Sequence, residues 1–120
     1  MEEIPYMEFP TGRRTHVMIG SNGAIKGEKF CQGFVEIEPS GSIPPHEHET
    51  VESYTVLSGE GEITIDGEKS VMKRGDYVFI SPLKRHGLVN TGKDVMRLMF
   101  VYAPQIVVDH WEREMNGTLK

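Results

Sequence analysis

Short runs in which apolar and polar residues alternate recur along the chain, and turn-forming residues separate them. A period of two indicates a strand whose two faces meet different surroundings. In one run, for example, Val35 and Ile37 would share a buried face while Glu36 and Glu38 share a solvated one. Eight such runs predict strands at residues 14–19, 30–38, 53–57, 62–65, 68–72, 77–80, 87–90 and 96–102. Short strands at this spacing predict an all-β sandwich or barrel.

Two local signals add detail to this pattern. Asp66-Gly67 stands between two of the alternating runs, and this dipeptide is the strongest short-range signal for a β-hairpin. Near the C-terminus, Val108, Trp111 and Met115 recur at helical spacing and predict one short amphipathic helix over residues 107–115. That helix would pack on the barrel or on a partner subunit, or else serve as a lid.

Length and charge narrow the function classes. With 120 residues, the chain predicts a single domain, with residues 1–12 as an N-terminal arm and 104–120 as the helix and a tail. The net charge is −5, and no long run of lysine or arginine occurs, which argues against nucleic-acid and membrane-surface binding. One cysteine, Cys31, excludes an intrachain disulfide. The N-terminus lacks the pattern of a secretory signal, so we expect a cytoplasmic location.

The segment after Pro44-Pro45 carries candidate chemistry. If it forms a strand, His46 and His48 lie on one face, about 6–7 Å apart, and both can reach one ion. Glu52 opens the next strand and can supply an anionic oxygen, and His86 follows a proline turn that is distant in the chain. The alternative for the histidine pair alone is an ordinary polar loop.

The stretch 41–59 resembles the first sequence motif of the cupin family. That motif is a glycine, then His-x-His, three residues, Glu, six residues and Gly, and His46, His48, Glu52 and Gly59 match it. The stretch 75–90 resembles the second motif, in which a histidine follows a glycine by eleven positions and an asparagine follows four later. Gly75, His86 and Asn90 match that motif.

Some positions depart from the family pattern. Ser40 occupies the place of a usual glycine, Pro82 stands one position late, and Lys84 stands near where a glycine is usual. None of these positions is a candidate ligand. The turn before His86 is where this chain is expected to differ in shape from its relatives.

The resemblance implies a double-stranded β-helix, or jelly-roll barrel, that holds one divalent metal ion. Its ligands would be His46, His48, Glu52 and His86, and two positions of an octahedral ion would stay open for water or substrate. Nitrogen and oxygen donors suit Mn, Fe, Co, Ni or Zn, and donor type does not choose among them. A closed structural zinc site is less consistent with a chain that has a single cysteine. Resemblance to small cupins also implies a homodimer.

Other side chains could line such a site. Tyr54 shares strand parity with Glu52, and Phe100 and Tyr102 share a face of the last strand. Tyr54 or Tyr102 could act as a catalytic acid, base or hydrogen-bond donor, or could be a core aromatic with a solvated hydroxyl. A carboxylate or phosphate could be anchored by cationic side chains that otherwise lie on the surface, namely Lys84, Arg85 and Arg97.

Three functions follow from this pattern. The first is a metalloenzyme that acts on a small oxygenated metabolite, such as a sugar acid, hydroxy acid or carboxylate, by isomerisation, lyase or decarboxylation chemistry. The second is an Fe(II)-dependent dioxygenase. The third is a non-catalytic small-molecule-binding module.

Overall fold

The computed structural model describes residues 6–19, 25 and 29–103, and these form ten β-strands. All eight predicted strands are present, with small differences at their ends. The strands are β1 (Tyr6–Phe9), β2 (Arg13–Ile19), β3 (Cys31–Ile37), β4 (Ser42–His46), β5 (Val51–Ser58), β6 (Glu60–Ile65), β7 (Glu68–Lys73), β8 (Tyr77–Ile80), β9 (His86–Asn90) and β10 (Met96–Ala103). The expected helix at 107–115 lies outside the described residues.

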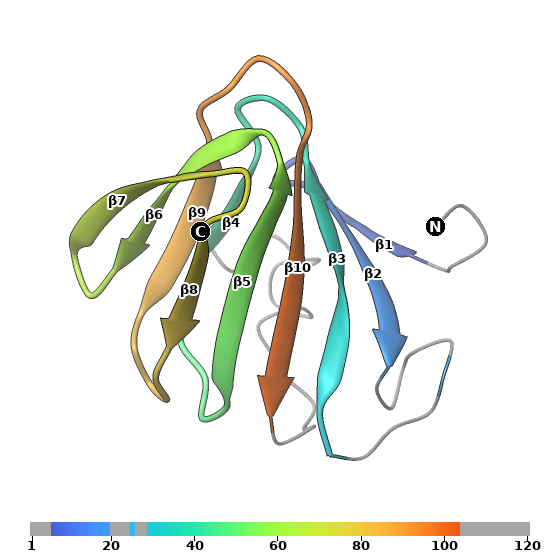
Figure 1. The fold of residues 1–120 in the computed structure, drawn as a ribbon, viewed down its shortest axis with the longest axis vertical. Helices are drawn as coiled ribbons and strands as arrows, with labels where there is room; N and C mark the ends of the chain where they lie inside the picture. The colour runs from blue at the N-terminus through green and yellow to red at the C-terminus, as the bar shows by residue number, and fades with distance from the viewer. Residues whose placement is uncertain (1–5, 20–24, 26–28, 104–120) are drawn as a thin grey trace.

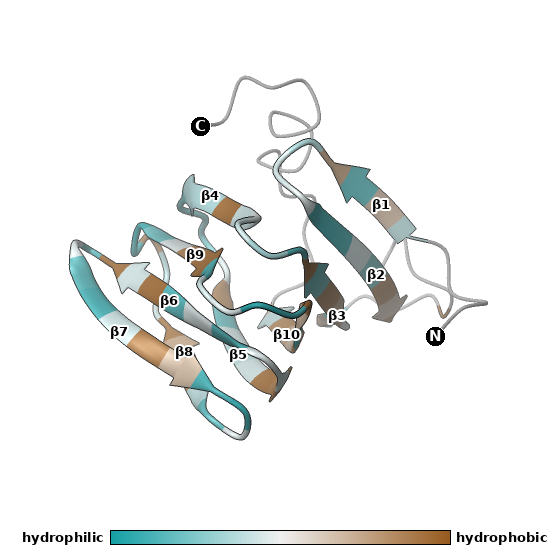
Figure 2. Ribbon diagram, turned by 90° about the horizontal axis from the view of Figure 1, so that it is seen from above, coloured by the Kyte–Doolittle hydropathy of each residue, from teal (hydrophilic) through white to brown (hydrophobic). Residues whose placement is uncertain are grey.

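The strands pair antiparallel in two sheets, which form the two layers of the fold (Figure 1, Figure 2). One sheet has six strands in the order β1-β2-β3-β10-β5-β8, and the other has four in the order β4-β9-β6-β7. Strands distant in the chain therefore become neighbours, as β3 and β10 do. The predicted all-β jelly-roll architecture is confirmed.

Strand alternation decides which side chains enter the core between the sheets. Along β3 every second residue is buried, from Cys31 to Ile37, and β10 repeats the pattern from Met96 to Tyr102. The small sheet closes the core from the other side with Ile43, Ile63 and Leu88. Burial of apolar side chains from both sheets stabilises the fold and fixes the register, because a one-residue slip would turn each inward side chain outward.

The Asp66-Gly67 hairpin is confirmed between β6 and β7. Both residues have positive φ, 48° and 85°, as the two-residue turn favoured in hairpins requires. The tip of this hairpin also contacts another turn. Asp66 N donates to Arg85 O at 2.8 Å, and Arg85 N donates to Asp66 Oδ1 at 3.0 Å. The hairpin therefore holds the residue that immediately precedes His86.

Two strands were not predicted from the alternating runs. Strand β1 lies in the segment expected to be an arm and pairs with β2 in register Phe9↔Arg13. Strand β4 contains Pro44 and Pro45, which lack the backbone N–H that a ladder uses. The two prolines are tolerated because β4 is an edge strand. The register of β4 with β9 also shifts between Ile43 and His46, so the ladder is irregular at the prolines.

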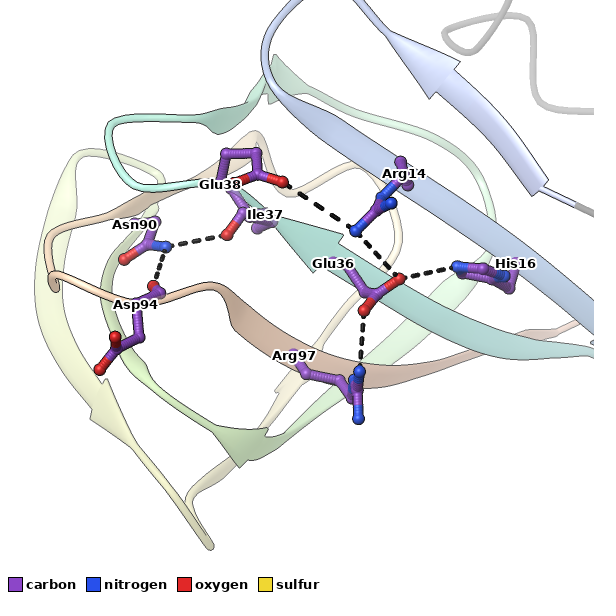
Figure 3. A network of polar contacts seen from close by, with 8 residues as sticks. All are labelled: Arg14, His16, Glu36, Ile37, Glu38, Asn90, Asp94 and Arg97. Carbon is purple, nitrogen blue, oxygen red and sulfur yellow. Dashed lines mark hydrogen bonds and ion pairs between the residues drawn. The ribbon is translucent and has the colours of Figure 1, made fainter. Parts of the chain in front are cut away.

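A charged network ties β2, β3 and β10 together on the outer face of the large sheet (Figure 3). Glu36 of β3 accepts from Arg97 at 2.8 Å, contacts His16 Nε2 at 2.9 Å and lies 3.6 Å from Arg14. Burial by itself would raise the pKa of Glu36, but the hydrogen bonds from Arg97 and His16 and the charge of Arg14 lower it. The ionised form of Glu36 therefore stabilises the folded state more than its protonated form does.

Replacing Glu36 with Gln should lower the free energy of unfolding at pH 7 by about 1 kcal/mol, because Arg97 is half-exposed and solvent weakens its ion pair. A lowered folded-state pKa means that this stabilisation is present above the ordinary pKa of 4.5 and is lost as the pH falls through the folded-state value. Urea unfolding of wild type and Glu36→Gln between pH 7 and pH 3 measures the difference. The more exposed Glu38→Gln is the control, and a gap that stays constant with pH would refute the assignment.

Candidate metal centre

Four side chains from both sheets meet at one point between the layers. His46 ends β4, Glu52 lies in β5 and His86 begins β9, while His48 lies in the connection between β4 and β5. One potential ligand atom from each of these four residues lies within 4.8 Å of the others. The structure therefore brings together all four predicted ligand residues in an arrangement that could hold a metal ion.

The expectation that His46 and His48 share one face of a regular strand is wrong. Strand β4 ends at His46, so His48 is positioned by its loop instead of by strand alternation. Thr50 holds it there, because its carbonyl oxygen lies 3.1 Å and its Oγ1 2.7 Å from His48 Nδ1. The two imidazole rings still approach each other, with centroids 5.4 Å apart.

All three histidines are oriented in the same way, through Nδ1. His46 Nδ1 lies 2.8 Å from Pro44 O, and His86 Nδ1 lies 2.8 Å from Lys84 O, which parallels the contact of His48 with Thr50 O. A carbonyl oxygen only accepts, so each Nδ1 carries a proton and donates it. A neutral ring then keeps its lone pair on Nε2, the form that coordinates a metal ion.

Glu52 shows that this cluster needs a positive charge. Its Oε1 lies 3.0 Å from His48 Nε2 and 3.2 Å from His86 Nε2. A neutral imidazole that already donates from Nδ1 would present a lone pair to that oxygen, which is repulsive. The contacts are favourable when a ring carries a second proton or when a cation lies between the rings and the carboxylate. The donor set therefore fits a divalent cation.

Burial and charge set the ionisation of the cluster. Burial and, to a smaller extent, the nearby His86 lower the pKa of His46 to about 3. Burial alone would raise the pKa of Glu52, but hydrogen bonds and charges from His48 and His86 outweigh this and lower it. For His48, burial opposes the charged form, yet its contact with Glu52 raises the pKa. The protein therefore keeps Glu52 anionic and His46 neutral, as metal ligation requires.

The turn before His86 contains a residue in the left-handed region of backbone conformation. Leu83 has a positive φ of 63°, and its N–H donates to His48 O at 2.8 Å. The loop of one ligand thus supports the turn that delivers another. Lys84 Nζ lies 3.2 Å from Asp66 Oδ2, so the hairpin tip supports the same turn from its other side.

A cavity of about 20 Å³ adjoins the cluster, which is room for one or two water-sized groups. The cavity wall contains the three aromatic residues that the sequence suggested could line the site, and all three are buried beside the candidate ligands: Tyr54, Phe100 and Tyr102. Its full lining is Arg13, Thr15, Val35, Ile43, His46, Glu52, Tyr54, Phe100 and Tyr102.

The sequence reasoning missed Arg13 and Thr15 in this lining. The predicted strand began at residue 14, and a charged residue just outside a predicted strand normally indicates a solvated position. The alternation of Arg13, Thr15 and Val17 with Arg14 between them was the signal that could have identified an inward face.

The side chains of the other candidate residues make their polar contacts with groups outside the cluster. Asn90 occupies the opposite end of β9 from His86, where its amide donates to Ile37 O and Asp94 O at 2.9 Å each (Figure 3). It joins the β9–β10 turn to β3. The three candidate anchoring cations make surface ion pairs, Lys84 with Asp66, Arg85 with Glu47 and Arg97 with Glu36. Cys31 is a buried free cysteine.

A family model described as a cupin domain matches residues 33–102, which is more than half of the chain. The chain belongs to the cupin family. Among cupin relatives, the dimethylsulfoniopropionate lyase DddW of Ruegeria pomeroyi is 32% identical over 71 residues, which cover 59% of this chain and 46% of that protein. The chain spans about half the length of the curated relatives that it matches.

Solved structures share the cupin fold at lower identity. KdgF from Halomonas sp. has a TM-score of 0.74 at 20% identity, and the match covers 88% of this chain and 90% of that one. The DMSP lyase DddQ from Ruegeria pomeroyi has a TM-score of 0.76 at 18% identity, covering 88% and 58%. At this identity the likeness shows the fold alone. No helix within the described residues has the length and apolar character needed to cross a bilayer.

In metal-free protein, His46 should stay neutral with its proton on Nδ1 from pH 8 down to about pH 4, because burial lowers its pKa to about 3. Nitrogen-15 correlation spectra of the imidazole rings report both the charge and the tautomer. The His46→Gln variant assigns the resonance. A doubly protonated His46 at pH 5.5 would contradict the burial argument.

Proposed function

We propose that this cupin is an enzyme that depends on one divalent transition-metal ion and acts on a small oxygenated metabolite. The observation that carries this proposal is the orientation of the cluster. Three Nε2 atoms and one carboxylate oxygen face one point, and each histidine donates its other ring proton to a carbonyl. Such outer hydrogen bonds fix the tautomer that ligates a metal.

The residues that would hold the ion are His46, His48, Glu52 and His86. Four protein donors of mixed nitrogen and oxygen type suit a borderline divalent ion. When bound, such an ion supplies Lewis-acid chemistry, which polarises a carbonyl or stabilises an enediolate. The protein contributes the buried surroundings, which exclude bulk water and strengthen electrostatic interactions.

The two tyrosines would have different roles. Burial raises the pKa of Tyr102, and its hydrogen bond with Cys31 raises it further, so its hydroxyl stays protonated and is already engaged with the thiol. Tyr54 lines the same cavity, with its ring centroid 6.1 Å from that of His86. We assign proton transfer to Tyr54, because it lines the cavity together with His46 and Glu52, and to Tyr102 the support of the cavity wall.

Lyase chemistry is the form of the reaction that the relatives favour. One curated relative and two structural neighbours are lyases of dimethylsulfoniopropionate, a small charged carboxylate. Elimination of this kind needs a base near the substrate and stabilisation of negative charge beside a carboxylate. It needs no oxygen, which separates it from the dioxygenase alternative.

Protein purified without added metal or chelator should contain about one divalent transition-metal ion per chain by elemental analysis. Replacing His46, His48 or His86 with Ala should weaken metal binding by roughly 100-fold or more. Loss of a residue that only hydrogen-bonds to a metal ligand typically lowers metal affinity about 10- to 100-fold, and loss of the ligand itself should lower it more. Chelation should lower the thermal midpoint, and re-addition of metal should restore it.

The matched control for these variants is Glu47→Ala. Glu47 lies between His46 and His48 in sequence, but its half-exposed side chain pairs with Arg85. Its removal should leave metal content and affinity unchanged. Full metal content in His86→Ala with correct folding would overturn the proposed centre.

Metal-loaded protein should turn over at least one member of a panel of sugar acids, hydroxy acids and short carboxylates, including dimethylsulfoniopropionate, under anaerobic conditions. Tyr54→Phe should then lower kcat by about 100-fold or more, the usual contribution of a positioned acid or base. Tyr102→Phe should lower it less. Turnover that requires oxygen would favour the dioxygenase, and ligand-induced stabilisation without any turnover would favour a binding module.

A further inference from the structure

A hydroxyl group is buried in the core at a position where an apolar side chain would be expected. Thr15 lies on the inward face of β2 and is only 1% exposed. Its neighbours across the two adjoining strands are Met7 of β1 and Val35 of β3, and both are apolar. Valine has nearly the same shape as threonine and would fill this position without a polar atom. The hydroxyl therefore needs a partner that its cross-strand neighbours do not supply.

Thr15 faces a cavity instead of a polar neighbour. Within residues 6–19, 25 and 29–103, its Oγ1 makes no hydrogen bond. A buried hydroxyl in this state lowers the stability of the folded protein, and most buried side-chain polar atoms do have a partner, either a protein group or an ordered water. The surface that Thr15 helps to form is the wall of the cavity beside the cluster. A partner for the hydroxyl is therefore to be sought in that cavity.

The size and the polarity of the cavity suit one water molecule. Its volume is about 20 Å³, and roughly 10–15 Å³ is enough to hold a water. A cavity with only apolar walls stays empty, whereas a cavity that offers a water about two to four polar partners is filled. The wall contains three polar residues besides Thr15 that belong to the cluster or adjoin it, namely His46, Glu52 and Tyr54. The cavity is too small for a larger ligand.

Glu52 is the strongest acceptor on this wall. Both of its contacts with the cluster, to His48 and to His86, are made by Oε1. An ionised carboxylate has about four lone-pair sites on its two oxygens, so Glu52 can accept a further hydrogen bond. Because the cavity has room for about one water, a molecule inside it meets Thr15 and Glu52 together.

We propose that Thr15 binds one buried water molecule, which donates a hydrogen bond to the carboxylate of Glu52. The hydroxyl of Thr15 donates to the water oxygen, and the water then directs its own protons to acceptors in the wall. Thr15 is thus a positioning residue that acts on Glu52 through the water. The water site itself requires no metal ion, whereas the effect of the water on Glu52 as a metal ligand rests on the proposed function.

Replacement of Thr15 by valine tests the water through the sign of the stability change. In chelator-treated protein, Thr15→Val removes a hydrogen-bond partner from the bound water, so the thermal midpoint should fall by about 2–6 °C. If the hydroxyl has no partner, the substitution removes an unsatisfied polar atom, and the midpoint should rise. A rise would overturn the proposal.

Thr55→Val is the matched control for this measurement. Thr55 is half-buried and lies on the outer face of the same sheet, since it alternates along β5 with the inward Tyr54 and Val56. Its change in thermal midpoint reports the intrinsic difference between threonine and valine in a strand. The change at Thr15 is therefore judged relative to the change at Thr55.

Oxygen-17 magnetic relaxation dispersion detects the water directly, because it counts water molecules that stay buried for longer than the protein takes to tumble. Chelator-treated wild type should hold about one more such water than Thr15→Val. Thr15→Ser keeps the hydroxyl and should keep the wild-type count, although it loses a methyl group from the core. Equal counts in wild type and Thr15→Val would overturn the water site, whatever the change in stability.

Binding of Zn²⁺ tests whether the water positions Glu52. Loss of a group that hydrogen-bonds to a metal ligand typically lowers metal affinity about 10- to 100-fold. Thr15→Val should therefore bind Zn²⁺ about 10-fold more weakly than wild type in titrations against a competing chelator, while Thr15→Ser and Thr55→Val should match wild type. If Thr15 contributes only to core packing, Thr15→Val changes the thermal midpoint and leaves the Zn²⁺ affinity unchanged, and the positioning role is overturned.

Failure of this inference can be told apart from failure of the proposed function. If wild type contains no transition metal and binds no Zn²⁺, the proposed function is overturned, while the water counts of wild type and Thr15→Val still decide the water site. If wild type binds metal and the two counts are equal, the water site is overturned and the proposed function is retained.

Discussion

Three hydrogen bonds from histidine Nδ1 atoms to backbone carbonyls determine what the centre of this protein can do. Each carbonyl belongs to a residue only two positions from its histidine, namely Pro44, Thr50 and Lys84. A hydrogen bond between residues so close in sequence fixes the plane and the tautomer of the imidazole ring, because few backbone torsions separate the donor from the acceptor. The larger architecture then needs only to bring the local units together, and it does so by placing β4 beside β9 with His46 opposite His86.

The convergence of the four ligands depends on the packing of both sheets. His46 and His86 come from the small sheet, and Glu52 comes from the large one. The buried apolar side chains between the layers therefore set the distance from the carboxylate to the rings. A low-dielectric interior strengthens each charge interaction, so the same packing keeps Glu52 ionised and His46 neutral.

Alternation along the sequence predicted most of the strands, and the resemblance to the two cupin motifs predicted the four cluster residues. Prediction from the sequence failed where tertiary context overrides local pattern. Strand β4 was not predicted because it contains Pro44 and Pro45, which a sheet tolerates at an edge position such as that of β4. His48 was assigned to a strand that ends two residues earlier. Arg13 was missed because charge predicts exposure, although its position alternates in phase with the buried Thr15 and Val17.

The contact between the β6–β7 hairpin and Arg85 has a consequence for how this chain can vary. A surface hairpin ordinarily tolerates insertions and deletions at its tip, because nothing else depends on its reach. Here Asp66 exchanges two hydrogen bonds with Arg85, beside a candidate ligand. The length of the β6–β7 hairpin therefore determines where Arg85 lies. Length changes at residues 66–67 would displace Arg85 and, with it, His86 from the cluster.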